Sequence, residues 1–71
     1  MKLFVTIDED GNLGAASVKN PIQCMKLIEN NEAFDSIISD YGLTEIDMIN
    51  FEDYLQNFVS RGLANIVEVS E

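Results

Sequence analysis

A chain of 71 residues, of which 46% are hydrophobic, is long enough for one folded unit, so we expect residues 1–71 to form a single small domain. Thirteen acidic side chains against four basic ones give a formal charge of −9, which argues against nucleic acid or an anionic membrane as a direct partner. The basic surface of another protein is the partner that this charge favours.

The cellular setting is indicated by the cysteine content and by the first residues. A single cysteine, Cys24, excludes an intramolecular disulfide and is typical of a reducing compartment. Residues 1–10, MKLFVTIDED, lack the basic start and apolar run of a signal peptide. The apolar runs of the chain are also too short for a membrane span. We therefore expect a cytoplasmic protein.

Residues 2–8, KLFVTID, predict the first strand. Side chains alternate between two faces of a strand, and Leu3, Val5 and Ile7 share one face. We expect that face to be buried. Phe4 then lies on the opposite face, where it is available for self-association.

The dipeptide Asp10-Gly11 predicts a tight hairpin turn, because a two-residue primed turn needs positive φ at both positions. This turn pairs Ile7 with Gly14. The second strand, residues 12–18, then places small side chains on the buried face, which leaves room for a helix to approach the sheet.

Oxygen-bearing side chains alternate around Gly11, as they do in a calcium-binding loop. Aligning this glycine with the glycine of that loop places Thr6 at the first ligand position and Ser17 at the last. The loop needs a carboxylate at the first position and a bidentate glutamate at the last. Both are missing, so we expect no metal here. The acidic residues 8–10 then keep the hairpin tip solvated.

Two helices are predicted after the hairpin. Asn20 is a favourable N-cap and Pro21 suits the first helical position, so the first helix begins there. The second follows from about Asn31 and ends at Gly42, a residue that adopts the left-handed conformation of helix ends.

Residues 44–61 allow two interpretations. The apolar side chains that share one helical face are Met48, Phe51, Leu55, Phe58 and Val59. Ile46 and Ile49 point away from that face. Either the helix breaks near Asn50, or its first turns present a second apolar face. We expect one continuous helix.

Residues 63–69, LANIVEV, are rich in β-branched side chains and predict the last strand. The expected order is therefore ββαααβ. This order indicates an α+β fold, with a small antiparallel three-stranded sheet and helices packed on one face.

Catalytic chemistry is not indicated. The chain has no histidine to activate Cys24, which suits a small buried position. The adjacent carboxylates Glu52 and Asp53 diverge by about 100° on a helix and cannot converge on one ion. We expect no enzyme activity, catalytic residue, metal or cofactor.

The acidic residues are unevenly distributed, because no basic residue lies between Lys26 and Arg61. The acidic residues of this interval are Glu29, Glu32, Asp35, Asp40, Glu45, Asp47, Glu52 and Asp53. They form either a solvated surface or a negative binding face. Ordinary helix surfaces mix both signs, and self-repulsion costs stability, so we interpret these residues as the partner-binding surface.

The size and charge of the chain are similar to those of the small acidic proteins with which phages and mobile elements block host machinery. We expect a non-catalytic binding protein that docks its acidic helices on a basic patch of a larger nucleic-acid-handling or defence protein. The alternative is a structural or assembly subunit that self-associates through Phe4, Ile46 and Ile49, with the acidic residues providing solubility. In either case a homodimer is expected, since a lone core of this size is marginally stable.

Overall fold

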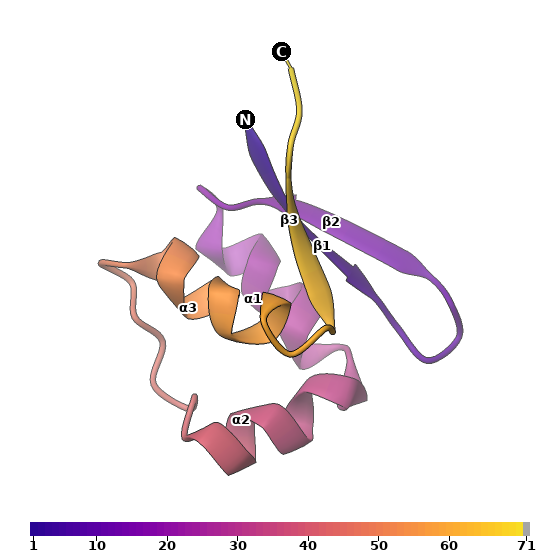
Figure 1. Ribbon diagram of the computed structural model, residues 1–71, viewed down its shortest axis with the longest axis vertical. Helices are drawn as coiled ribbons and strands as arrows, with labels where there is room; N and C mark the ends of the chain where they lie inside the picture. Colours follow the sequence, from indigo (N-terminus) through magenta and orange to yellow (C-terminus); the bar gives the residue numbers. More distant parts are fainter. Residues whose placement is uncertain (71) are drawn as a thin grey trace.

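The computed structural model describes residues 1–70 and shows a small sheet with helices on one face (Figure 1). The elements are β1 (Lys2–Ile7), β2 (Leu13–Ser17), α1 (Pro21–Glu29), the short 3-10 helix η1 (Glu32–Phe34), α2 (Asp35–Tyr41), α3 (Phe51–Val59) and β3 (Ala64–Glu68). This arrangement confirms the predicted α+β class and ββαααβ order. Within residues 1–70, the helices are all too short to cross a bilayer.

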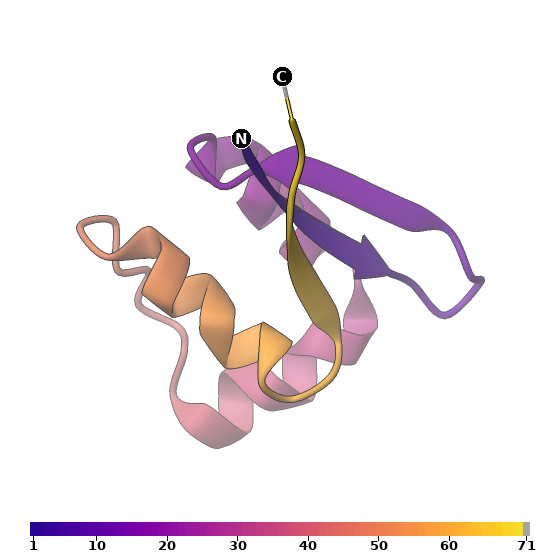
Figure 2. The same ribbon diagram turned by 45° about the horizontal axis from the view of Figure 1, so that its top comes forward.

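The sheet has the strand order β2-β1-β3, and both pairs are antiparallel. The first strand of the chain is therefore the central strand of the sheet. Figures 1 and 2 show the helices gathered on one side of the sheet, with α1 beneath β1 and β2 and α3 beside β3. Of the described residues, no helix covers the other side.

The hairpin turn between β1 and β2 has three residues where two were predicted. The Asp8 amide donates to the Asn12 carbonyl at 3.0 Å, and the Gly11 amide donates to the Asp8 carbonyl at 3.0 Å. Gly11 has φ 84°, the left-handed conformation that closes a type I turn followed by a bulge. The Asp8 carboxylate also accepts from the amides of Asp10 and Asn12, which fixes the longer loop.

The extra loop residue changes the strand register by one. Ile7 pairs with Leu13, so the predicted pairing of Ile7 with Gly14 is wrong. Because side chains alternate, a change of one residue exchanges the two faces of one strand relative to the other. Thr6 now pairs with Gly14 and Phe4 with Ala16 on the same face.

The orientation predicted for β1 is wrong for this reason. Phe4 is fully buried and Thr6 is buried, whereas Leu3 and Val5 are only half-buried and Ile7 is exposed. The interpretation of Phe4 as a self-association residue is also wrong, since its ring belongs to the core. Both faces of β1 carry apolar side chains, and alternation alone does not indicate which one the helices cover.

The small residues of β2 do lie on the buried face, as predicted. A Cβ atom on Gly14 would come within 2.6 Å of Leu27 Cδ2, so α1 approaches the sheet closely at this position. Ala16 packs against the core beside it. A side chain at residue 14 would force the Leu27 side chain to move away from the sheet.

The core is built mainly from aromatic rings. The Phe58 ring packs edge-on against Phe34 and Tyr54, with centroids 5.1 and 5.5 Å away. Cys24 is fully buried in the same core and its thiol donates to the Ser17 carbonyl at 3.2 Å. Burial raises the pKa of the Cys24 thiol and keeps it protonated.

The predicted helix ends are confirmed where capping residues define them. Asn20 Oδ1 accepts from the Gln23 amide at 3.3 Å at the start of α1. Asn31 Oδ1 accepts from the Ala33 amide at the start of η1, and Gly42 ends α2 with φ 64°.

The predicted continuous helix over 44–61 is wrong, because α3 begins only at Phe51. Asp47 Oδ1 accepts from the amides of Ile49 and Asn50 at 3.1 and 2.9 Å. Such side-chain bonds to nearby amides compete with helix formation. Met48, which was expected in the core stripe, lies in the resulting loop and is exposed.

Candidate protein-binding site

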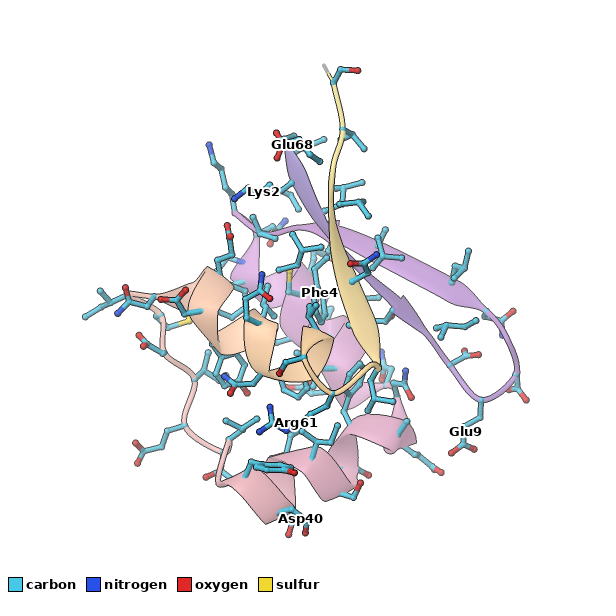
Figure 3. The ribbon with its side chains drawn as sticks, in the orientation of Figure 1. Lys2, Phe4, Glu9, Asp40, Arg61 and Glu68 are labelled. Atoms are coloured by element: carbon cyan, nitrogen blue, oxygen red, sulfur yellow. The ribbon has the colours of Figure 1, made fainter. Side chains whose placement is uncertain are left out.

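The eight acidic residues predicted to bind a partner come from several elements. Seven are exposed, and the eighth, Glu52, lies 3.1 Å from Lys2 Nζ through its Oε2 atom. Glu29 and Glu32 line two hollows that share no residue. Asp40 lies at the far end of α2, away from the hairpin tip (Figure 3). The structure therefore does not gather the eight residues into one compact site.

One hollow joins Glu32 to the hairpin tip. Its lining residues are Asp8, Glu9, Asp10, Asn30, Asn31 and Glu32, and its volume is about 250 Å³. The sequence interpretation missed this association, because residues 8–10 were assigned only to solvation of the tip. Asn31 holds the hollow together, since its buried side chain donates to the Ile7 carbonyl at 3.0 Å.

The described residues, 1–70, contain no cluster of potential metal ligands. Among residues 1–70, no three carboxylate or thiol side chains converge as a metal site requires. At the hairpin tip, one oxygen of Asp8 is already engaged by two backbone amides. The loop also lies between two strands, where a calcium-binding loop has helices.

The second hollow is an apolar groove between α1 and the loop of residues 44–50. Its lining residues are Pro21, Ile22, Met25, Lys26, Glu29, Ile46 and Met48, and its volume is about 320 Å³. Ile22 is 70% exposed and Met48 is 59% exposed, and together they form a contiguous apolar surface, which is a common feature of interaction sites. We call this hollow the groove.

Hydrogen bonds at both ends order the loop that forms one wall of the groove. The Tyr54 hydroxyl donates to the Leu43 carbonyl at 2.9 Å before the loop begins, and burial raises the pKa of Tyr54. Asp47 binds the amides of the last two loop residues. All seven residues from 44 to 50 are exposed, and Ile49 is 93% exposed. The apolar side chains are thus held out to solvent by an ordered backbone.

The lining of the groove carries one charge of each sign, and more carboxylates follow in the adjoining loop. Glu29 belongs to the lining together with one cation, Lys26. Glu45 and Asp47 flank Ile46 in the sequence, and both are exposed. Carboxylates therefore alternate with apolar side chains along the sequence of this loop, of which Ile46 and Met48 line the groove.

Two of the four basic side chains, Lys2 and Arg61, contact other groups of the same chain. The Arg61 guanidinium lies 3.6 Å from the centre of the Tyr41 ring, and its Nη1 donates to the Asn57 carbonyl at 2.7 Å. Lys2 is paired with Glu52. Figure 3 shows Lys2 near the start of β1 and Arg61 between α3 and α2, so the two basic side chains do not form one patch.

The sequence identified part of the groove and missed part of it. Ile46 and Ile49 are exposed as predicted, although the continuous helix assumed there does not form. Ile22 was missed as a surface residue, and Met25, which is partly buried against the core, was missed as part of the groove lining. Their spacing with Glu29, at i, i+3 and i+7, marks a second face of α1 beside the buried face of Cys24 and Ile28.

Comparison with known proteins assigns no family to this chain. No protein-family model matches it, and no curated protein and no solved structure matches it.

Proposed function

We propose that this is a non-catalytic binding protein whose groove receives a basic amphipathic segment of a larger protein. One observation carries the proposal: the groove presents exposed apolar side chains from two elements, Ile22 of α1 and Met48 of the loop, on a chain of charge −9. Its lining adds the carboxylate of Glu29 and the ammonium group of Lys26. A segment with an apolar stripe and basic flanks would satisfy both parts.

The apolar part of the groove supplies most of the expected affinity. Burying one such side chain stabilises a complex by about 1.5–3 kcal/mol before the costs of ordering are subtracted. Met25 and Met48 also adapt to partners of different shape, because methionine is flexible and polarizable. An apolar groove beside a helix is a common receptor for an amphipathic helix.

The negative charge determines which segment binds. A formal charge of −9 attracts basic surfaces over a distance and accelerates their association. The carboxylates at the groove then favour lysine and arginine at the flanks of the bound segment. The acidic residues elsewhere, including Glu32 at the hairpin tip, contribute to the general attraction.

A basic segment of this kind is typical of proteins that bind phosphates. We therefore propose a nucleic-acid-handling or defence protein as the partner, with this chain as a cytoplasmic inhibitor from a phage or mobile element. This finer proposal is supported by the small size and the strong negative charge.

Self-association through the same groove is less favourable. A second copy would bring its own acidic loop towards that of the first, and the single cation of the groove, Lys26, can offset only one carboxylate of each copy. A basic partner avoids this repulsion. The groove therefore fits a different protein better than it fits a second copy.

The proposal is tested by titrating the ¹⁵N-labelled protein with a synthetic amphipathic helical peptide made of leucine and lysine. We expect the largest amide shifts in α1 and in residues 44–50. A peptide of identical composition, scrambled so that it has no apolar stripe, is the control and should bind more weakly. Raising salt from about 0.05 to about 0.5 M should weaken binding, because exposed charges are screened within about 8 Å at physiological ionic strength.

Equal binding of the two peptides would contradict the groove mechanism and leave only a general charge attraction. Shifts confined to the hairpin tip and Glu32 would move the site to the acidic hollow. Binding that is indifferent to salt would contradict the role of the carboxylates.

A further inference from the structure

The side of the sheet that faces away from the helices is apolar and uncharged. Alternation along the paired strands places Leu3, Val5, Ile7, Leu13, Ala15 and Val67 on this side, which we call the outer face. None of these residues packs against the core. The pairing also places two polar residues on this side, Ser17 opposite Leu3 and Asn65 opposite Val5, and both are uncharged.

This composition is unusual for a sheet that has helices on one side only. In such sheets the side without helices is normally polar, because it contacts water. Here Leu13 is 75% exposed and Ile7 is 54% exposed, while the chain as a whole carries a charge of −9. Its charged residues lie elsewhere, which indicates that the outer face is covered in the functional form.

We propose that a second copy of this chain covers the outer face, so that two sheets pack face to face in a symmetric dimer. The charge distribution supports this occupant. Two chains of charge −9 repel each other, and contact between them is least unfavourable where carboxylates are absent. The outer face meets that condition, whereas the groove does not.

The shape of the face also suits a two-fold contact. At one end of the outer face, Val5, Ile7, Leu13 and Leu63 line an apolar hollow of about 250 Å³. The Leu13 side chain forms part of the wall of this hollow and is also exposed to solvent. A two-fold axis presents the same patch from both copies, so the leucine of each copy enters the hollow of the other.

The available area sets the strength of the dimer. Three strands of five or six residues give a flat footprint of roughly 250 Å², from a strand spacing of about 4.8 Å and a rise of about 3.3 Å per residue. Projecting side chains about double this area, so two copies bury about 1,000 Å², near the lower limit for a specific interface. We therefore expect a dimer that dissociates in the micromolar range.

Sedimentation equilibrium tests the proposal over protein concentrations from about 1 to about 500 µM. The unchanged chain should shift from monomer to dimer over this range. Leu13→Glu should remain monomeric throughout, because it places two carboxylates in a dry contact. Ile49→Glu is the matched control: it adds the same charge at a more exposed position in the loop and should dimerise like the unchanged chain.

A monomer at every concentration would overturn the proposal. Dissociation by Ile49→Glu with no effect of Leu13→Glu would place the contact at the loop instead, and would also overturn it. Circular dichroism confirms that each variant is folded. If Leu13→Glu fails to fold, Ala15→Lys, at an exposed position of the same face, replaces it and should give the same monomer. The peptide titration at the groove is a separate measurement, so either proposal can fail alone.

Discussion

The groove and the outer face are both apolar and exposed, but they differ in their charge and in the regularity of their backbone. The groove is formed partly by an irregular loop, and carboxylates lie beside its apolar side chains. The outer face is a regular sheet without a charged residue among the positions that define it. On a chain of charge −9, the position of charge distinguishes a surface for a basic partner from a surface for a second copy.

The largest effect should come from removing the loop's apolar side chains. We expect Ile46→Ser with Ile49→Ser to weaken peptide binding by about 10–100-fold, equivalent to about 1.4–2.8 kcal/mol. The exposed positions of both residues should leave the fold intact. Dimerisation, measured by sedimentation, should be unchanged. Loss of the dimer with unchanged peptide affinity would reverse the assignment of the two surfaces.

Two small substitutions in β2 test which of its faces is buried and which is the outer face. Gly14→Ala should lower the free energy of unfolding by about 1–2 kcal/mol, because the new Cβ meets Leu27 Cδ2 at 2.6 Å. Ala15→Ser also adds one heavy atom, but on the outer face, and should change the stability of the monomer little. Urea denaturation at about 1 µM protein, where the monomer predominates, measures both. Equal effects would contradict the assignment of the two faces.

A smaller effect on peptide affinity should distinguish a charge at the groove from the total charge of the chain. Glu29 lines the groove and Glu32 lines the hollow at the hairpin tip, and both are exposed. Each change to lysine alters the net charge equally, from −9 to −7, because one negative charge becomes one positive charge. Glu29→Lys should weaken peptide binding about threefold more than Glu32→Lys, as expected for a difference of about 0.7 kcal/mol. Equal losses in titration calorimetry would show that only the total charge matters.

The smallest effect concerns Cys24, on the buried face of α1. Burial raises the pKa of Cys24, so the folded state retains its proton at a pH where the unfolded state loses it. Stability should therefore decline as pH rises above about 9, the ordinary range of a cysteine thiol. Cys24→Ala should show a weaker decline in chemical denaturation between neutral and alkaline pH. An identical decline in both proteins would assign it to other groups.

Local signals in the sequence were sufficient for the start of α1 and the end of α2, but not for the start of α3. Asn20 and Gly42 act as predicted because capping depends on the backbone within a few residues. The order of elements followed from the same signals. The residues at the ends of α1 and α2 therefore defined these helices without knowledge of the packing.

The orientation of β1 required information that alternation does not contain. Both of its faces are apolar, and the choice between them depended on the number of loop residues, which the Asp8 carboxylate increased to three. A two-residue turn at Asp10-Gly11 was the simpler prediction. The single extra residue was enough to place Phe4 in the core and Ile7 at the surface.

The groove could be predicted only in part, because it also depends on contacts that the hydrophobic pattern does not contain. The periodicity of 44–61 fits a helix, but Asp47 binds the amides that such a helix would use. The exposure of Ile46 and Ile49 was predicted because they lie outside the apolar face of the predicted helix. The position of Ile46 beside Ile22 and Met25 depends on tertiary packing, which no local signal describes.

The central position of β1 has a consequence for how the chain folds. Its neighbours are β2, which follows directly, and β3, whose residues Ala64–Glu68 come near the other end of the described chain. The hairpin can form early, but the second edge of β1 stays unpaired until β3 has been synthesised. Contacts between distant segments form slowly, and an open apolar strand edge invites aggregation. Shortening the chain before residue 64 should therefore yield a product that aggregates during synthesis, even though every helix is present.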